Sequence, residues 1–538
     1  MPPRTSGLAT VLALWAAMWA VNFLWLERDT RLPAWDMALH QSYALNYWPG
    51  APSDGTPLPP AERSGTYPPW VHLMIALSYF VFHPGPHIAV LANIPATLLL
   101  LWCVYLLGED LAGASAGRWA CVLTALIPFM IWMSRETILD YWLAAWTAAG
   151  LVALRRTDRF QSHGQSLWFG VICALGLLTK WFFAALLVFP VLAVCIRSRI
   201  WRSETRLIHL ADAAMIAGLG AGVWYLPNLP RLGRYFLENA AIGAREGEPP
   251  VFSFQSLIYY LRLLEGYQLF GLLFLVLGIS VIVAWKRRLV RDGWFLAAAV
   301  IGGWVAMTLL RTKDPRFTLP LLGPLMVIAG AWVAAWTQTA GMRILQAGLI
   351  VVLVFQAYAA NFGVRGLPEA IVLARGYQGS LRWDWNLYLQ NYFHILGPPR
   401  REDWKQEEIL RRLATDARDR KVEPSLALIP DLPRFNAENF RLMARLRGIP
   451  ARIAHLQAGP DGMVPFAGYD YVIMAEGDQG MSWSTVYSRA LNQYVVDHPD
   501  VFRLVELYLL PGGSSARLYF IARGVREADA PPDRRAMP

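Results

Sequence analysis

Residues 167–196 read LWFGVICALGLLTKWFFAALLVFPVLAVCI, and Lys180 is the single charged residue within this stretch. A membrane-spanning helix needs about 17–25 predominantly apolar residues, so the stretch is too long for one span. It predicts two short spans, 167–179 and 181–196, with Lys180 between them. An ionisable side chain at membrane depth is costly and typically faces a cavity with a function. Lys180 is therefore the first candidate functional residue.

The composition of the whole chain indicates the same environment. Of 538 residues, 55% are hydrophobic and 16% are charged, whereas soluble proteins are about 25% charged. These values exclude a soluble enzyme, a disordered chain and a disulfide-rich secreted domain. They predict a polytopic α-helical membrane protein of about eleven spans, the first an uncleaved anchor. We place the spans at 7–26, 87–107, 116–133, 138–154, 167–179, 181–196, 207–226, 266–285, 293–310, 318–337 and 342–361.

The topology follows from the basic residues of the short loops, since cytoplasmic loops carry an excess of Lys and Arg. With a cytoplasmic N-terminus, the clusters near 155–159, 197–206 and 286–291 and Arg343 all lie inside. Much of the net charge of +10 then orients the spans, so we do not expect nucleic acid as a partner.

Outside the spans we expect two structured regions. The first outer loop, 27–86, contains two stretches, 36–48 and 70–83, that read as helices lying in the membrane interface. Residues 1–361 thus form a transmembrane domain, and 362–538 form an outward-facing soluble α/β domain. In that domain we expect helices at 436–447 and 485–498, and strands at 425–430, 451–456, 469–474, 502–510 and 516–523.

Several ionisable residues lie at the outer ends of otherwise apolar spans. The basic ones are also on the side of the membrane that the positive-inside rule disfavours. The acidic ones are Asp36, Glu136 and Asp140, and the basic ones are Lys180, Arg311, Lys313 and Arg316. Cations at this level suit a lipid phosphate, and carboxylates suit a general base or a metal site.

Plainer roles exist for these residues. Lys180 could extend its ammonium to the interface, and Asp140 could cap a helix N-terminus. Glu136 could pair with Arg135, and Asp36 could be an ordinary N-terminal residue of its helix. The four His residues near the outer interface match no strong metal motif, and the aromatic residues could form an interfacial belt.

In order along the chain, these residues resemble the C-type membrane glycosyltransferases that use polyprenyl-phosphate sugars. The protein O-mannosyltransferases and the transferases that put aminoarabinose on lipid A are the most similar families. The resemblance covers residues 7 to about 340 and rests on short motifs: Trp35-Asp36, Thr66-Tyr67-Pro68-Pro69, Tyr105-Leu-Leu-Gly108, Ser134-Arg135 before Asp140, Leu177-Leu178-Thr179-Lys180, and Lys313-Asp-Pro-Arg316-Phe317 leading to Pro320.

Two positions depart from the family patterns. Met37 follows Asp36 where the mannosyltransferases have Glu, and Thr66-Tyr67 stand where the lipid A enzymes have Glu-Lys. The resemblance therefore carries over neither a lipid A acceptor nor a metal site built on that Glu.

The resemblance implies an inverting glycosyltransferase that moves a sugar from a polyprenyl-phosphate donor to an acceptor hydroxyl on the periplasmic face. The acceptor would be a lipid, a glycan or a protein. Asp36 would be the catalytic base, with Asp140 and Glu136 in the same cavity. Lys180, Arg311, Lys313 and Arg316 would bind the donor phosphate, and His40, Tyr43 and Tyr67 would line the substrate cavity.

The expected location is a bacterial inner membrane, crossed several times, with the C-terminal domain in the periplasm. No cofactor is required by the sequence, although the carboxylates and a phosphate could share a divalent metal cation. Two other classes of protein stay open. One is a transporter or flippase of a lipid-linked sugar, which needs the cations but no base. The other is a non-catalytic membrane subunit with a periplasmic binding domain.

Overall fold

The computed structural model describes residues 4–49, 58–336, 339–378, 381–389, 397–456, 466–481 and 484–522. The chain forms two compact units. One, the membrane unit, comprises Met1–Glu27, Pro60–Ile75 and Val90–Pro399. The other, the C-terminal unit, comprises Arg28–Pro59, Ala76–Ala89 and Arg400–Pro538. By sequence we expected the boundary after residue 361, whereas the second unit also takes in parts of the first outer loop.

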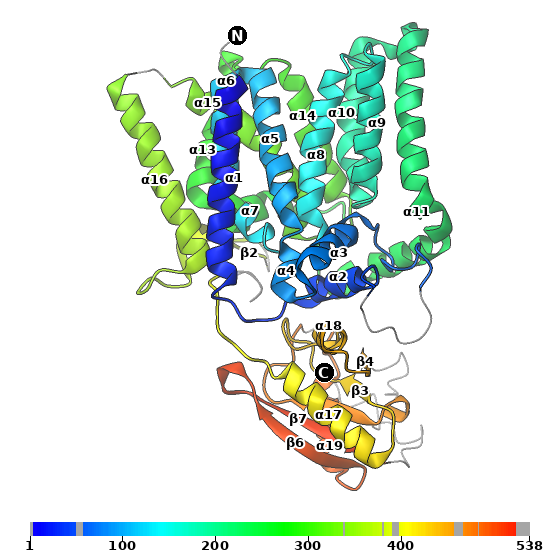
Figure 1. Ribbon diagram of the computed structural model, residues 1–538. Coiled ribbons are helices and arrows are strands. Elements are labelled where there is room, and N and C mark those ends of the chain that lie inside the picture. Colours follow the sequence, from blue (N-terminus) through cyan, green and yellow to red (C-terminus); the bar gives the residue numbers. More distant parts are fainter. Residues whose placement is uncertain are drawn as a thin grey trace. The chain divides into compact units, whose positions relative to one another are not determined.

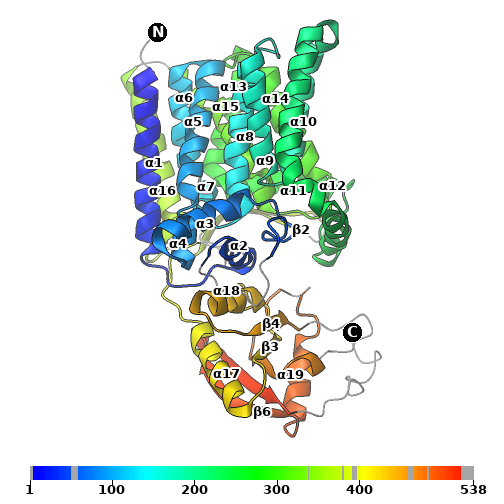
Figure 2. The ribbon, with the colours of Figure 1, turned by 45° about the vertical axis from the view of Figure 1, so that its right-hand side comes forward.

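A helix occupies each of the eleven stretches that were expected to span. Within the described residues, six helical segments are long and apolar enough to cross a membrane, and three further apolar helices are shorter. The helices are α1 (Arg4–Leu26), α5 (Asn93–Ala112), α6 (Ala114–Ala125), α7 (Pro128–Met133), α8 (Leu139–Arg156), α9 (His163–Leu177), α10 (Phe182–Ser198), α11 (Glu204–Arg245), α12 (Phe254–Leu263), α13 (Phe270–Arg287), α14 (Gly293–Thr308), α15 (Leu319–Ala334) and α16 (Ala340–Phe362). Helices α1, α5, α8 and α9 run side by side (Figures 1 and 2).

Short elements complete the helical part. The 3-10 helices η1 (Ile200–Arg202) and η3 (Pro315–Thr318) lie between spans, and the π-helix η2 (Leu264–Leu269) joins α12 to α13. Helices α2 (Trp35–Leu45), α3 (Trp70–Phe82) and α4 (Pro86–Val90) belong to the first loop. Two of them occupy the stretches 36–48 and 70–83 that were expected to be helical.

The structure differs from the expected spans at several places, of which two are the largest. The stretch 116–133 is not one helix, because Pro128 has no N–H to continue the hydrogen-bond pattern and instead begins α7. Helix α11 continues to Arg245, well past the expected end at 226. The break at Lys180 between α9 and α10 is where the sequence placed it.

A hairpin that the sequence analysis missed packs on the membrane unit. Strands β1 (Ala370–Gln378) and β2 (Leu381–Leu389) are antiparallel. The main-chain N–H of Asn386 donates to the Glu265 carboxylate on η2 at 3.0 Å, and the Gln356 amide of α16 donates to the Leu387 carbonyl at 2.7 Å. The hairpin is thereby bound to two helices of this unit.

The C-terminal unit is a five-stranded sheet with helices on both faces. Its strands are β3 (Ser425–Leu428), β4 (Arg452–His455), β5 (Tyr471–Ala475), β6 (Phe502–Leu509) and β7 (Ser515–Ile521), in the order β4-β3-β5-β7-β6. Strands β4, β3 and β5 are parallel, and β7 and β6 are antiparallel to their neighbours. The strands and helices expected in this region are all present.

Alternate strand residues face opposite sides of the sheet. Leu426 and Leu428 pack against α17 (Gln406–Arg420) and α18 (Ala437–Arg447), whereas Ala427 packs on the other side against α19 (Ser488–Asp497). Helix α17 was not predicted. The period-two alternation thus buries both faces of the sheet.

Within the membrane unit, α15 packs so closely on α6 that the backbones of the two helices are in contact at Gly330. A Cβ atom added to Gly330 would lie 2.6 Å from the Ala120 nitrogen and 2.7 Å from the Ala116 oxygen. Both neighbours are backbone atoms and cannot move as a side chain does. Only glycine therefore allows this helix contact.

We predict that Gly330→Ala lowers the thermal unfolding midpoint of the detergent-solubilised protein, with a destabilisation on the order of 1–3 kcal/mol from overpacking. The matched control is Gly348→Ala on α16, where an added Cβ meets nothing within 4 Å. Equal midpoints for the two variants would contradict the close packing of α15 on α6.

Candidate functional site

Lys180 and Asp140 form a buried ion pair in the membrane unit. Asp140 lies in the first turn of α8, where the helix dipole favours a carboxylate. Lys180 lies in the turn between α9 and α10, and its Nζ donates to the Asp140 carboxylate at 2.7 Å. The side chains are only 8% and 3% exposed. The structure thus brings together two predicted site residues that are forty positions apart in the sequence.

The Lys180 ammonium also contacts two aromatic rings. It lies 4.9 Å from the ring centroid of Phe182 and 4.8 Å from that of Phe317. These distances are in the range of cation–π attraction. Phe317 directly follows Arg316 on η3, so the end of the turn 311–316 comes close to the Lys180 side chain.

A group of aromatic side chains adjoins this pair. The Tyr67 ring stacks on Trp181, with centroids 6.0 Å apart and planes 12° apart. Tyr235 of α11 meets Tyr67 edge-on at 5.8 Å, and its hydroxyl donates to the Tyr67 hydroxyl at 3.2 Å. Aromatic faces of this kind suit sugar rings and isoprenoid chains. Tyr67 was predicted from the sequence, but Trp181 and Tyr235 were not.

The cations of the turn 311–316 have different surroundings. The Lys313 ammonium is 4% exposed and donates to the carbonyl oxygens of Thr308 and Leu310 at 2.9 and 2.8 Å. Arg316 forms an ion pair with Asp314 at 2.8 Å. Arg311 is exposed. The Lys313 ammonium is thus hydrogen-bonded to carbonyl oxygens of the adjoining chain. Arg311 is the most solvent-accessible of the three cations.

Glu248 faces the same turn and was not predicted. Burial raises the pKa of its carboxyl to about 8, and the charge of Glu246 adds to that effect. The main-chain N–H and the charge of Lys313 oppose it. Burial in turn lowers the pKa of Lys313, against the attraction of Glu248. Nothing in the local sequence around Glu248 marks it, because its partner is more than sixty residues away.

The remaining predicted residues lie elsewhere. The Glu136 carbonyl accepts a hydrogen bond from the Asn93 amide at 2.8 Å in the membrane unit. Asp36, His40 and Tyr43 lie on α2, which belongs to the C-terminal unit. His40 is buried there, while Asp36 and Tyr43 are half-buried.

The residues do not favour a metal centre. Across the parts of the chain that the structure describes, no group of three or more His, Cys, Asp or Glu side chains is arranged to hold an ion. Asp140, the most buried of the predicted carboxylates, is already neutralised by Lys180.

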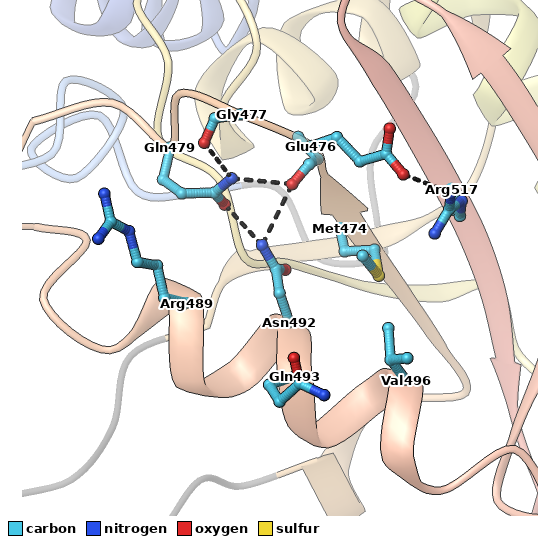
Figure 3. A pocket seen from close by; sticks show the side chains of 10 residues that line it. Met474, Glu476, Gly477, Gln479, Arg489, Asn492, Gln493, Val496 and Arg517 are labelled. Carbon is cyan, nitrogen blue, oxygen red and sulfur yellow. Dashed lines mark hydrogen bonds and ion pairs between the residues drawn. The ribbon is translucent and has the colours of Figure 1, made fainter.

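A separate hollow of about 330 Å³ lies beside the carboxyl end of β5 in the C-terminal unit (Figure 3). Its amide side chains bind one another and the chain. Gln479 donates to the Ala475 carbonyl at 2.8 Å, and Asn492 donates to the Gln479 side chain at 3.1 Å. The amide nitrogens of both side chains thus already donate within the chain, and we assign the hollow no ligand.

The fold is similar to the folds of two solved proteins. The structure superposes on ArnT from Cupriavidus metallidurans in the apo state with a TM-score of 0.60, at 15% identity, over 96% of this chain and 97% of that one. It also superposes on the archaeal oligosaccharyltransferase AglB from Archaeoglobus fulgidus with a TM-score of 0.51, at 12% identity, over 95% of this chain and 74% of that one.

Sequence comparisons agree with the resemblance that the motifs indicated. Residues 66–224 match the model of the dolichyl-phosphate-mannose-protein mannosyltransferases. The undecaprenyl phosphate-alpha-4-amino-4-deoxy-L-arabinose arabinosyl transferase 1 of Pseudomonas fluorescens is 31% identical over 36% of this chain, and that of Edwardsiella ictaluri is 27% identical over 49%. The matched segments span 36% and 48% of these two relatives.

We predict a pH dependence of stability from Glu248. A carboxyl whose pKa is raised on folding contributes stability below its unfolded pKa, and this contribution is lost as the pH rises towards the folded value. Between pH ~5 and ~8 the unfolding midpoint of the wild type should therefore fall more than that of Glu248→Gln. Glu238→Gln, at an exposed position of α11, is the control and should follow the wild type. Parallel curves for Glu248→Gln and the wild type would contradict the raised pKa.

Proposed function

We propose that the protein is an inverting glycosyltransferase that uses a polyprenyl-phosphate sugar as donor. The observation that carries the proposal is the buried Lys180–Asp140 pair beside the aromatic group of Tyr67 and Trp181. A buried cation next to apolar and aromatic surface is suited to a phosphate that enters on a lipid chain. The fold and the sequence relatives, which are named for undecaprenyl-phosphate sugar transfer, support the same chemistry.

The leaving group of such a donor needs no general acid. The acceptor oxygen attacks the anomeric carbon, and the bond from that carbon to the phosphate oxygen breaks on the opposite face. The electron pair leaves with the polyprenyl phosphate, whose charge Lys180 and the cations of the turn 311–316 would stabilise. The acceptor proton passes to a carboxylate, which we assign to Asp36. This route inverts the sugar and differs from ordinary glycoside hydrolysis, which uses an acid and a base.

The other predicted residues receive supporting roles. Asp140 would hold Lys180 in place until the phosphate arrives, because a buried ammonium without a partner is strongly unfavourable. Glu136, four residues before Asp140, would lie near the bound donor. Arg311, Lys313 and Arg316 would contact the phosphate, and His40, Tyr43 and Tyr67 would contact the sugar or the acceptor.

We further propose a bacterial inner-membrane location with a cytoplasmic N-terminus and a periplasmic C-terminal unit. Contacts among the arginine-rich loops support this orientation. Arg155 pairs with Asp110 and with Asp292 at 2.7 and 2.8 Å, and Arg197 lies over the Trp294 ring at 4.8 Å. The basic clusters that follow α8, α10 and α13 thus lie near one another. This places them on one side of the membrane, as the positive-inside rule requires.

Asp36→Asn should abolish transfer without altering the fold, since the amide cannot accept the acceptor proton. The measurement is release of polyprenyl phosphate from a panel of polyprenyl-phosphate sugars by the purified wild type and variant, with thermal unfolding as the folding control. Full release by Asp36→Asn would overturn the base assignment. Transport of the intact donor across proteoliposomes, unaffected by Asp36→Asn and without release, would point to a flippase instead.

Lys180→Ala should weaken the binding of undecaprenyl phosphate roughly tenfold or more, because a charge-assisted contact is lost. The change leaves Asp140 unpaired and should destabilise the protein by about 3–5 kcal/mol. The double variant Lys180→Ala/Asp140→Asn relieves that cost and separates binding from folding. Native mass spectrometry in detergent measures the affinity. Unchanged binding in the double variant would remove Lys180 from the phosphate site.

A further inference from the structure

The short helix α2, which carries Asp36, is held by the C-terminal unit. Helix α2 has only eleven residues, and isolated helices shorter than about 12–15 residues are marginal in water. It packs against α18 within that unit. The geometry of Asp36 therefore depends on its packing partner rather than on the helix alone.

The N-terminal end of α2 is fixed by the loop that follows β3. The Trp35 N–H donates to the Pro433 carbonyl at 3.2 Å, and the Trp35 indole donates to the Asp431 carboxylate at 3.0 Å. Trp35 immediately precedes Asp36, so both bonds act one residue from the proposed base.

Buried side chains of the same segment bind the chain that leads into α2. The Arg434 guanidinium, 6% exposed, donates to the Leu32 carbonyl, and the fully buried Asn439 amide donates to the Pro33 carbonyl. Both acceptors are main-chain oxygens, so these contacts fix the path of the backbone whatever side chains it carries.

The C-terminal end of α2 is fixed by α18. The Arg445 guanidinium donates to the Ser42 carbonyl at 2.6 Å. Residues 431–445 thus contact the chain on both sides of Asp36 and His40, and we call this segment the α2 clamp.

The clamp also brings a second carboxyl group near Asp36. Glu438, at the start of α18, pairs with Arg441. Burial raises the pKa of Glu438, and the neighbouring charges of Asp36 and Asp431 raise it further, while Arg441 lowers it. Asp36 thus lies close enough to a carboxyl of the clamp to interact with it electrostatically.

We infer that the α2 clamp, residues 431–445 of the C-terminal unit, positions the Asp36 helix for catalysis. This inference rests on the proposed function, because it presumes that Asp36 is the base. The clamp residues do not react. They act through the placement of Asp36, and displacing a catalytic group by about 1 Å can cost on the order of 100-fold in rate.

The test uses full-length variants that each remove one clamp contact. Arg445→Ala and Trp35→Phe should lower kcat for polyprenyl-phosphate release roughly tenfold or more, with the KM for the donor and the binding of undecaprenyl phosphate unchanged. Arg445→Lys, which can still donate to the Ser42 carbonyl, should restore part of kcat. Arg503→Ala, an exposed arginine on β6 of the same unit, is the matched control and should retain full activity.

The outcomes separate this inference from the proposed function. If Asp36→Asn is inactive while Arg445→Ala and Trp35→Phe keep the wild-type kcat, the clamp has no positioning role and the proposed function stands. If Asp36→Asn is fully active, the proposed function fails first. Loss of donor affinity together with kcat would show a general structural defect and would also overturn the inference. If Arg445→Ala does not fold, Trp35→Phe decides, because it keeps an aromatic ring and removes only the indole donor.

Discussion

The cost of burying a charge is the constraint on which the site depends. Lys180 interrupts an apolar stretch that would otherwise continue through two spans, and its ammonium lies in a largely dehydrated position. Such a group is tolerated only with a partner, and the fold supplies Asp140 from the N-terminal turn of α8. The turn between α9 and α10 carries Lys180, and the first turn of α8 carries Asp140. Phe317 of η3 contacts Lys180, so all of these elements come together at the ion pair.

The same constraint explains why the pair suits an anionic lipid. Two buried opposite charges are held in balance, and removing either one leaves the other uncompensated. An arriving phosphate would share the Lys180 ammonium with Asp140, and the negative charge that it adds would be balanced by the cations of the turn 311–316. The rings of Phe182 and Phe317 exclude water around it, which strengthens electrostatic attraction at short range. Under the proposed function, this pair is the resting state from which Lys180 binds the donor phosphate.

The sequence predicted the features that local patterns encode. Apolar length located the spans, and short apolar segments located strands β3 to β7. Residues 381–389, LRWDWNLYL, alternate apolar and polar side chains, and this pattern could have revealed β2. The sequence could not show that Lys313 is committed to two carbonyls of its own turn, or that Glu248 faces it. Those facts depend on how distant loops fold back, which no local period records.

The family match covers a smaller part of this chain than the fold match does. The family match at residues 66–224 contains Tyr67, Asp140 and Lys180 but not Asp36 or the α2 clamp. The fold match, by contrast, extends over nearly the whole chain. Residues that bind a phosphate on a lipid chain meet the same chemical demand whatever the acceptor, so their surroundings can stay similar in sequence. The clamp holds α2 mainly through main-chain carbonyls, so it can keep its geometry while the side chains around it change. Because the acceptors of these hydrogen bonds belong to the backbone, substitutions in residues 32–42 can change side chains without removing a bond to the clamp.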